Sequence, residues 1–359
     1  MRKDPIFAGA GKGAIHWPLS RRSVLGTGFA LATAARAGSA LADSGLNDRL
    51  SAITRLIELV RTQYPDVALA NAAAQTLRTN VLAETYSGIN EPTELAQRLT
   101  RDLVEVTADK HLKVSVESGP SAPTDPAHDA GFLRSINYGL MGIRQSRAEV
   151  AVVTINFFPE LSTAPSLYSM YGGLMNLVAS SRGLVIDLRG NMGGSPETVA
   201  HLMSYFFDVS PRKKIAEVIY RHKAPQTYFT RERLEGPRYG TERPLVIVVS
   251  HSTFSAGEAF AYHLRSQRRA IIVGEQTGGG ANPGDSFRLN GTFSAFIPTG
   301  RVVDAVTGTN WEGTGIIPDI AATGDEAVTS ARKEVLKAAL VFAKDANDRA
   351  EIQFGLTHA

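Results

Sequence analysis

The sequence contains no cysteine among its 359 residues. Without thiols the chain can form no disulfide, thiolate zinc site, iron–sulfur cluster or cysteine nucleophile. No stretch beyond the N-terminal region is long and apolar enough to predict a membrane-spanning helix, so the mature chain is expected to have no transmembrane segment. The residues that are present, 43% apolar and 20% charged, are typical of a globular protein with a core and exclude a disordered or collagen-like chain.

Residues 1–42 have the composition of an export signal. They hold six basic residues and one acidic residue, and Arg21 and Arg22 stand before a weakly apolar run over 24–35. Residues 40–42, Ala-Leu-Ala, offer a small-residue cleavage site. This order predicts a twin-arginine (Tat) signal peptide and a periplasmic or secreted mature protein. The apolar run is too short, and too rich in small residues, to predict a membrane anchor instead.

The charge balance changes when that segment is set aside. The whole chain carries 38 Lys and Arg against 35 Asp and Glu, a net charge of +3. Residues 43–359 carry 32 basic and 34 acidic residues, a net of −2. The basic excess belongs to the signal, and no nucleic-acid partner is therefore predicted.

The mature chain divides into a helical part and an α/β part. Apolar residues at helical spacing predict an N-terminal helical bundle over 43–117. A linker rich in Pro, Ser, Gly and Asp is expected over 118–131. Apolar, β-branched runs then alternate with helical stretches, which predicts an α/β domain with a mostly buried sheet over 132–348. Residues 349–359 are expected to form a polar tail. The predicted helices of the bundle cover residues 46–63, 67–86 and 94–106, and the predicted strands are residues 150–157, 184–188, 245–249 and 270–273.

Four segments rich in glycine, serine and asparagine accompany these strands, where open α/β sheets place their sites. Backbone N–H groups in the first can converge on an anion. A serine in the second, at a strand-to-helix turn, can be exposed and aided by the helix N-terminus. Each segment alone is also explained as a tight turn or a helix cap, but four of them on one sheet predict a common site. The segments are GNMGGSP (190–196), SHSTFSAGE (250–258), GEQTGGGANP (274–283) and NWEGTGIIPD (310–319).

These segments resemble, in the same order, those of the C-terminal processing (tail-specific) peptidase family, serine peptidases that include the tricorn core. The sequence Asp109-Lys110-His111-Leu112 at the end of the bundle is similar to the branch that contains the interphotoreceptor retinoid-binding protein repeats. The resemblance covers nearly all of the mature chain. It implies a ClpP/crotonase-like catalytic domain preceded by the bundle, and a serine-type peptidase that cleaves peptide or protein substrates by acyl-enzyme chemistry.

The resemblance also assigns roles to residues. It implies Ser255 as nucleophile, His111 as general base and Glu312 as the acid that orients the histidine. The backbone N–H groups of Gly193 and Ala256 are the expected donors of an oxyanion hole.

Several neighbouring residues are candidates of lower rank. His251 is nearer to the serine in sequence but is ranked second as base, and Ser250 and Ser252 are expected to be structural. The tail-specific branch activates its serine with a lysine in the third segment, where this chain has Gly280, so no Ser/Lys dyad is expected there. Lys110 stands where the tricorn core has a hydroxyl that relays between acid and histidine. The contact between acid and histidine is accordingly either direct or absent.

No cofactor and no metal ion are expected, because the eight histidines are scattered without paired ligand spacing. The interval between His111 and the strand at residue 150 is too short for a PDZ domain, so substrate recognition is expected in the cleft between bundle and sheet. Two other functions stay open: a non-catalytic periplasmic carrier of an apolar ligand on the same fold, and an esterase with the same triad. A homo-oligomer stays open as well.

Overall fold

The structure is a computed structural model that describes residues 45, 47–117, 130–145 and 149–358. The predicted signal and residues 118–129 of the predicted linker lie outside the described residues. The chain divides into two compact units at Asp48, and the second, Arg49–Ala359, contains the sheets and helices named below. None of the helices described there is both long and apolar enough to cross a membrane.

The three helices of the predicted bundle are present. Residues 49–63 are helical, followed by α2 (Val67–Leu82) and α3 (Pro92–Thr107). The Asp66 side chain caps α2 by accepting hydrogen bonds from two backbone N–H groups of its first turn. α3 ends at Thr107, and the left-handed φ of 57° at its C-cap, Ala108, turns the chain into the segment that carries His111.

Strands that the sequence pattern did not predict complete the N-terminal part. β1 (Lys113–Val116) pairs antiparallel with β10 (Phe293–Pro298), which pairs in turn with β9 (Gly284–Arg288). Phe293 and Ile297 share one buried core with the helices. The N-terminal part therefore includes residues from the C-terminal third of the chain, and β1 follows directly on the segment that carries His111.

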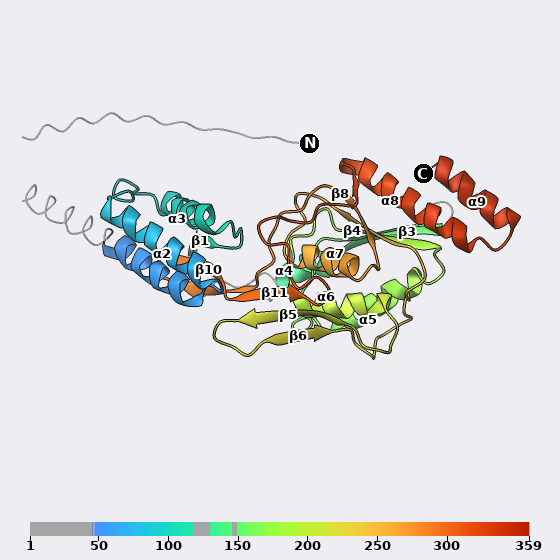
Figure 1. The fold of residues 1–359 in the computed structure, drawn as a ribbon, viewed down its shortest axis with the longest axis horizontal. Coiled ribbons are helices and arrows are strands. Elements are labelled where there is room, and N and C mark those ends of the chain that lie inside the picture. The colour runs from blue at the N-terminus through green and yellow to red at the C-terminus, as the bar shows by residue number, and fades with distance from the viewer. Residues whose placement is uncertain (1–44, 46, 118–129, 146–148, 359) are drawn as a thin grey trace, which may run out of the picture. The chain divides into compact units, whose positions relative to one another are not determined.

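The main sheet has six strands in the order β12-β8-β7-β4-β3-β2, parallel except for β2. Strands β3, β4 and β8 of this sheet are labelled in Figure 1. Its four central strands are the four that the sequence predicted. Strands of a parallel sheet covered on both faces are nearly continuous apolar runs, which explains why composition alone located them. The strands are β2 (Leu140–Gln145), β3 (Val150–Ile155), β4 (Gly183–Asp187), β7 (Leu245–Val249), β8 (Ile271–Gly274) and β12 (Ile320–Ala321).

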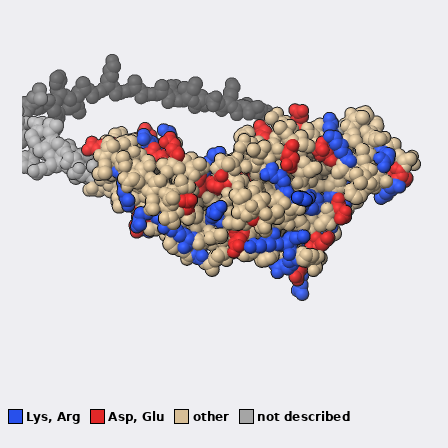
Figure 2. All heavy atoms as spheres, viewed as in Figure 1, with Lys and Arg blue, Asp and Glu red and all other residues tan. Residues whose placement is uncertain are grey.

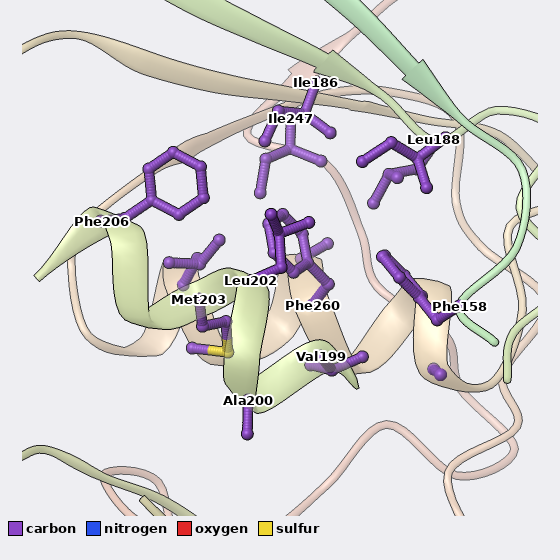
Figure 3. Packing of buried hydrophobic residues seen from close by; sticks show 14 of the residues in the cluster. Phe158, Ile186, Leu188, Val199, Ala200, Leu202, Met203, Phe206, Ile247 and Phe260 are labelled. Atoms are coloured by element: carbon purple, nitrogen blue, oxygen red, sulfur yellow. The ribbon is translucent and has the colours of Figure 1, made fainter. Parts of the chain in front are cut away.

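Helices cover both faces of this sheet. Alternate side chains along a strand point to opposite faces. Ile186 and Ile247 belong to the core with α5, α6 and α7, whereas Val185 and Val246 belong to the core with α8 and α9. Figure 3 shows Leu202 of α6 and Phe260 of α7 packed beneath Ile186 and Ile247. The helices are α5 (Ser166–Leu177), α6 (Pro196–Met203), α7 (Ala256–Ser266), α8 (Gly324–Ala339) and α9 (Ala346–Thr357).

The C-terminal residues differ from the prediction. The polar tail expected over 349–359 is part of helix α9 as far as Thr357. Asp345 caps this helix by accepting from the backbone N–H of Asp348, and Ile352 is fully buried in the core beneath α8. Its apolar residues Ile352, Phe354 and Leu356 are spaced two apart and not three or four, so the sequence carried little periodic signal for a docked helix.

A third sheet of three antiparallel strands was also not predicted. β5 (Lys214–Tyr220) is central, between β11 (Gly300–Asp304) and β6 (Gln226–Phe229). It supplies Ile215, Val218 and Val302 to the pocket described below. The remaining elements are short: α4 (Ala130–Ser135), η2 (Asn137–Gly139), η4 (Ser204–Phe206) and η5 (Leu340–Phe342).

Basic and acidic side chains are interspersed over the face of the molecule in Figure 2. This distribution agrees with the near balance of charges in residues 43–359. The face shown therefore presents no broad surface of one sign.

Candidate active site

Ser255 stands at the turn between β7 and α7, directly before the first helical residue, Ala256. Its backbone has φ 54° and ψ −121°, a conformation that costs a non-glycine residue on the order of 1–3 kcal/mol. Strained positions of this kind are concentrated at functional turns, and here the strain is held in place by a hydrogen bond from the Ser255 N–H to Oε2 of Glu258 (2.9 Å). The predicted nucleophile is thus half-buried at the start of a helix.

Glu258 ties this turn to the third glycine-rich segment. Its fully buried carboxylate accepts hydrogen bonds from the N–H groups of Gly279 (2.7 Å) and Gly280 (2.9 Å) and from the hydroxyl of Thr277. Burial raises the pKa of Glu258, and these hydrogen bonds work against that rise. The sequence did not predict that Glu258 connects two loops.

Gly193 lies against the serine turn. Its φ of 112° is a backbone conformation that residues with a side chain rarely adopt. A Cβ at this position would lie 2.7 Å from Cβ of Ser255. Its N–H donates to Oδ1 of Asn191 (2.9 Å), so this predicted oxyanion donor is bonded within the protein. The N–H groups of Ala256 and of the neighbouring Gly194 make no hydrogen bond to a described residue. Gly194 is a further candidate donor that sequence reasoning missed, although it stands in the same glycine pair.

Gly193→Ala should lower kcat for peptide hydrolysis about 100-fold, because the new methyl group would displace Ser255 from the donors beside it. The measurement is the initial rate on a fluorogenic peptide. Gly173→Ala in α5 is the matched control, since a Cβ at Gly173 meets no atom within 4 Å. Activity of Gly193→Ala equal to that of the control would contradict this placement.

His111 follows the turn that ends α3, and its ring packs between two phenylalanines. The centroid of the imidazole lies 4.6 Å from that of the Phe254 ring, next to Ser255 in sequence, and 6.1 Å from that of the Phe296 ring. Burial lowers the pKa of His111, while the nearby charge of Asp109 raises it. A buried imidazole with a lowered pKa stays neutral at neutral pH, which is the state that a general base requires.

Two carboxyl groups, not one, lie behind this imidazole. Asp109 is fully buried, and its Oδ1 lies 3.8 Å from Nδ1 of His111 and accepts the backbone N–H of His111 (3.0 Å). Its Oδ2 accepts from Tyr64 (3.1 Å) and from the amide of Asn282 (3.2 Å). The sequence singled out the segment 109–112 but did not assign Asp109 a role; the Asp-x-His spacing was the available signal.

Glu312, the predicted orienting acid, is the second carboxyl group. Its Oε2 accepts the N–H groups of Ala281 (2.6 Å) and Asn282 (2.9 Å), while Oε1 and Nδ1 of His111 are both buried without a hydrogen-bond partner. One carboxylate oxygen of Asp109, one of Glu312 and one ring nitrogen of His111 all lie within 4.8 Å of one another. Burial and the negative charge of Asp109 raise the pKa of Glu312 to about 8.

Two carboxyl groups and a histidine can also hold a metal ion. Within the described ranges, Asp109, His111 and Glu312 are the one group of three such residues with suitable spacing. Both oxygens of Asp109 and one oxygen of Glu312 already accept hydrogen bonds from the protein. A carboxylate oxygen has two lone pairs, so Oδ1 of Asp109, Oε1 of Glu312 and Nδ1 of His111 remain available, three atoms as in zinc catalytic sites. A digest in the presence of EDTA separates a metal centre from two acids that face an imidazole.

Ser255 and His111 line the same pocket, of about 500 Å³, but make no hydrogen bond to each other. The pocket is lined by the segments that follow β3 and β4, by α6 and α7, and by strands of the two smaller sheets. It is mostly apolar, with Phe157, Val199 and Trp311 in its wall. A Cβ on Gly280 would lie 2.7 Å from Cε1 of His111 and closer still to the Phe254 ring. The imidazole and Phe254 thus occupy the space that a side chain at position 280 would need.

The lower-ranked candidates lie elsewhere. His251 is exposed, with Nδ1 3.4 Å from the carboxylate of Glu275, and does not line the pocket. The Ser250 hydroxyl donates to the backbone oxygen of Arg189 (2.7 Å), a structural role. Lys110 donates from Nζ to the backbone oxygen of Gly278 (2.6 Å), so it holds the third segment and forms no relay between histidine and acid.

Comparison with known proteins identifies two family regions. Residues 149–322 match the model of peptidase family S41, and residues 47–138 match the N-terminal domain of peptidase S41 in eukaryotic IRBP. A carboxy-terminal-processing protease from Bartonella bacilliformis is 25% identical over 248 residues, which cover 65% of this chain and 44% of that protein. The chain thus spans less than half the length of that relative.

Solved structures share the fold at low sequence identity. Mature CPAF in complex with lactacystin superposes with a TM-score of 0.56 at 11% identity, over 86% of this chain and 99% of that one. A lipoprotein from Streptococcus agalactiae superposes with a TM-score of 0.53 at 15% identity, over 81% of this chain and 96% of that one. At these identities the likeness concerns the fold alone.

Proposed function

This chain belongs to peptidase family S41, and we propose that it is a serine-type peptidase that hydrolyses peptides or proteins through an acyl-enzyme. One observation carries the proposal most strongly. A strained serine at a helix start shares a pocket with a buried imidazole that has two carboxyl groups behind it. Nucleophile, base and orienting acid are the three parts that serine acyl transfer requires.

In the proposed reaction, Nε2 of His111 takes the hydroxyl proton of Ser255 as Oγ attacks the carbonyl carbon of the substrate. The C–N bond then breaks, and the leaving amine takes the proton from the imidazolium. Water repeats the sequence on the acyl-enzyme and releases the new carboxyl group. Serine and histidine must move into hydrogen-bond contact for the first step, and catalytic hydrogen bonds are often long before substrate binds.

The N–H of Ala256 and the N–H groups of the Gly193–Gly194 turn are assigned the stabilisation of the negative charge that develops on the carbonyl oxygen. Each donor of an oxyanion hole contributes about 3 kcal/mol to transition-state stabilisation. The Ala256 and Gly194 N–H groups make no hydrogen bond to a described residue, whereas the Gly193 N–H must first leave Asn191.

The two carboxyl groups are assigned different charge states. A carboxyl group with a pKa of about 8 is mostly protonated at pH 7, so Glu312 holds a proton there and positions the third and fourth segments. Asp109 is then the group that compensates the imidazolium as it forms. This assignment replaces the predicted orienting acid by its neighbour on the bundle.

A digest tests the proposed function. The purified protein is incubated with a mixture of synthetic peptides and with an unfolded protein, in EDTA, and products are identified by mass spectrometry. Internal cleavage that is unaffected by EDTA is expected, because no step uses a metal. Absence of any cleavage, or cleavage that requires added Zn²⁺, would contradict the proposal.

Glu312 also predicts a pH dependence of stability. A carboxyl group whose pKa is raised from 4.5 to about 8 on folding contributes stability that is fully present below pH 4.5 and is lost as pH rises through 8. The free energy of unfolding, measured by urea titration, should therefore fall by a few kcal/mol between pH 5 and pH 8.5. Glu312→Gln should flatten this fall, and Glu326→Gln, at an exposed position, should leave it unchanged. Parallel curves for Glu312→Gln and the unmodified protein would contradict the assignment.

A carrier of an apolar ligand is the second candidate function. The apolar pocket and the absence of a hydrogen bond between Ser255 and His111 favour it. A carrier would bind an apolar fluorophore saturably and leave the peptide mixture intact, so the digest separates the two functions. An esterase would be revealed if the protein cleaves acyl esters but not peptides.

Export through the twin-arginine route belongs to the same proposal, and Arg21 and Arg22 are its support. The described part of the chain does not include them. Replacing both by lysine in the full-length protein and following its location by cell fractionation tests this route.

A further inference from the structure

A second histidine, outside the proposed catalytic group, lines the pocket as a buried pair with an aspartate. Nδ1 of His263 lies 2.7 Å from Oδ2 of Asp304, and both side chains are almost fully buried. Since an ionised carboxylate only accepts, Nδ1 is the donor, and the remaining ring nitrogen, Nε2, is an acceptor in the neutral imidazole.

Asp304 is held in one orientation. Its Oδ1 accepts the N–H groups of Val306 (2.9 Å) and Thr307 (2.7 Å), and its Oδ2 also accepts the hydroxyl of Ser266 (2.8 Å). Burial would raise the pKa of this carboxyl group, but hydrogen bonds, first that from His263, lower it to about 2. The carboxylate stays charged and fixes which nitrogen of His263 carries the proton.

The position of His263 on α7 links it to the proposed nucleophile. Ser255, Ala259 and His263 follow one another at intervals of four residues and all line the pocket. At 1.5 Å per residue, His263 lies about 12 Å along the helix from Ser255. The pocket thus extends along the helix from the nucleophile, and His263 is the residue of α7 farthest from Ser255 that lines it.

The free ring nitrogen of His263 is chemically isolated. Nε2 makes no hydrogen bond to any described residue, and the neighbouring Trp311 presents its ring with centroids 5.5 Å apart. Among the described residues that line the pocket, none is Lys or Arg, and Glu160 is the one acid. A carboxylate at the end of this pocket would find no cation and would face the charge of Asp304. An apolar side chain with a hydrogen-bond donor at its tip fits instead.

On the basis of the proposed function, we propose that His263 determines which substrate side chain the pocket accepts. The pocket takes the side chain of the substrate residue whose carbonyl Ser255 attacks (P1), and Nε2 of His263 accepts a hydrogen bond from a hydroxyl at its tip. Among the common residues, tyrosine combines a large apolar body with such a hydroxyl. The substrate class is therefore peptides with tyrosine at P1, in preference to phenylalanine.

The test compares kcat/KM for peptides that differ only in Tyr, Phe or Arg at P1. The unmodified protein should favour Tyr over Phe by about tenfold, because one hydrogen bond distinguishes them. His263→Asn keeps an N–H at the position of Nδ1 for Asp304 but removes Nε2, so the ratio should fall to about one. His263→Gln places its amide near the position of Nε2 and should retain part of the preference. His251→Asn, the same change at an exposed histidine outside the pocket, should keep the original ratio.

The outcomes separate this inference from the function on which it rests. A Tyr/Phe ratio near one in the unmodified protein, a preference for Arg, or a ratio that His263→Asn leaves unchanged overturns the role of His263 while peptidase activity stands. A protein that cleaves none of the peptides overturns both. Labelling by a small fluorophosphonate, measured for each variant, establishes that a lost preference does not reflect a lost fold.

Discussion

Replacing Ser255 by alanine is expected to abolish peptide hydrolysis, with a fall in kcat of about 10⁵-fold. Oγ of Ser255 forms the covalent bond in the proposed mechanism, and no other described hydroxyl occupies its position. Ser250 is bonded to the backbone of Arg189, and Ser252 is exposed away from the pocket. Initial rates on a peptide taken from the digest provide the measurement.

The fold should tolerate this change, because Ala removes one oxygen and keeps Cβ. The backbone bond from residue 255 to Glu258 does not involve the hydroxyl. Ser252→Ala is the matched control, three residues earlier in the same turn, and should retain the activity of the unmodified protein. If Ser255→Ala keeps more than about 1% of the rate, Ser255 is not the nucleophile.

Asp109→Asn is expected to have the second-largest effect, a fall in kcat of about 10³-fold with little change in KM. Asp109 is assigned the charge that stabilises the imidazolium of His111, and an uncharged amide cannot supply it. The change is small in volume, and the amide oxygen can still accept from the backbone of His111. The thermal midpoint of each variant is measured alongside the rates to separate lost catalysis from lost stability.

Glu312→Gln provides the comparison for this experiment. Because the pKa of Glu312 is raised to about 8, the amide replaces a group that is already uncharged at pH 7, and a fall of only about tenfold is expected there. The two variants thus differ by about 100-fold at pH 7. The reverse order, with Glu312→Gln the more damaging, would restore Glu312 as the acid that orients the base.

Local sequence features predicted much of the catalytic domain. The four central strands are buried on both faces, so their residues form continuous apolar runs that can be recognised without knowledge of the fold. The turn at Ser255 could be predicted equally well, since its residues and the helix that follows are neighbours in sequence. His111 and Glu312 required the family resemblance, because they are separated by about 200 residues and meet only in the folded chain.

Features that depend on pairing between distant segments were not predictable. β1 and β10 are short strands whose pairing joins residue 113 to residue 296, and neither has a pattern that distinguishes it from a loop. Asp109 was overlooked for a similar reason, since its partners come from Tyr64 and Asn282. The pair of His263 and Asp304 likewise joins a helix to a strand 41 residues later.

The measurement that tests the central claim most directly is the site of covalent labelling by a fluorophosphonate, which reacts with activated serines. After incubation of the purified protein, intact mass and peptide mapping identify the number of adducts and the residue that carries them. A single adduct on Ser255, formed much more slowly in His111→Gln, is the predicted result. No adduct, or an adduct on another residue, would contradict the assignment of Ser255 and His111 as nucleophile and base.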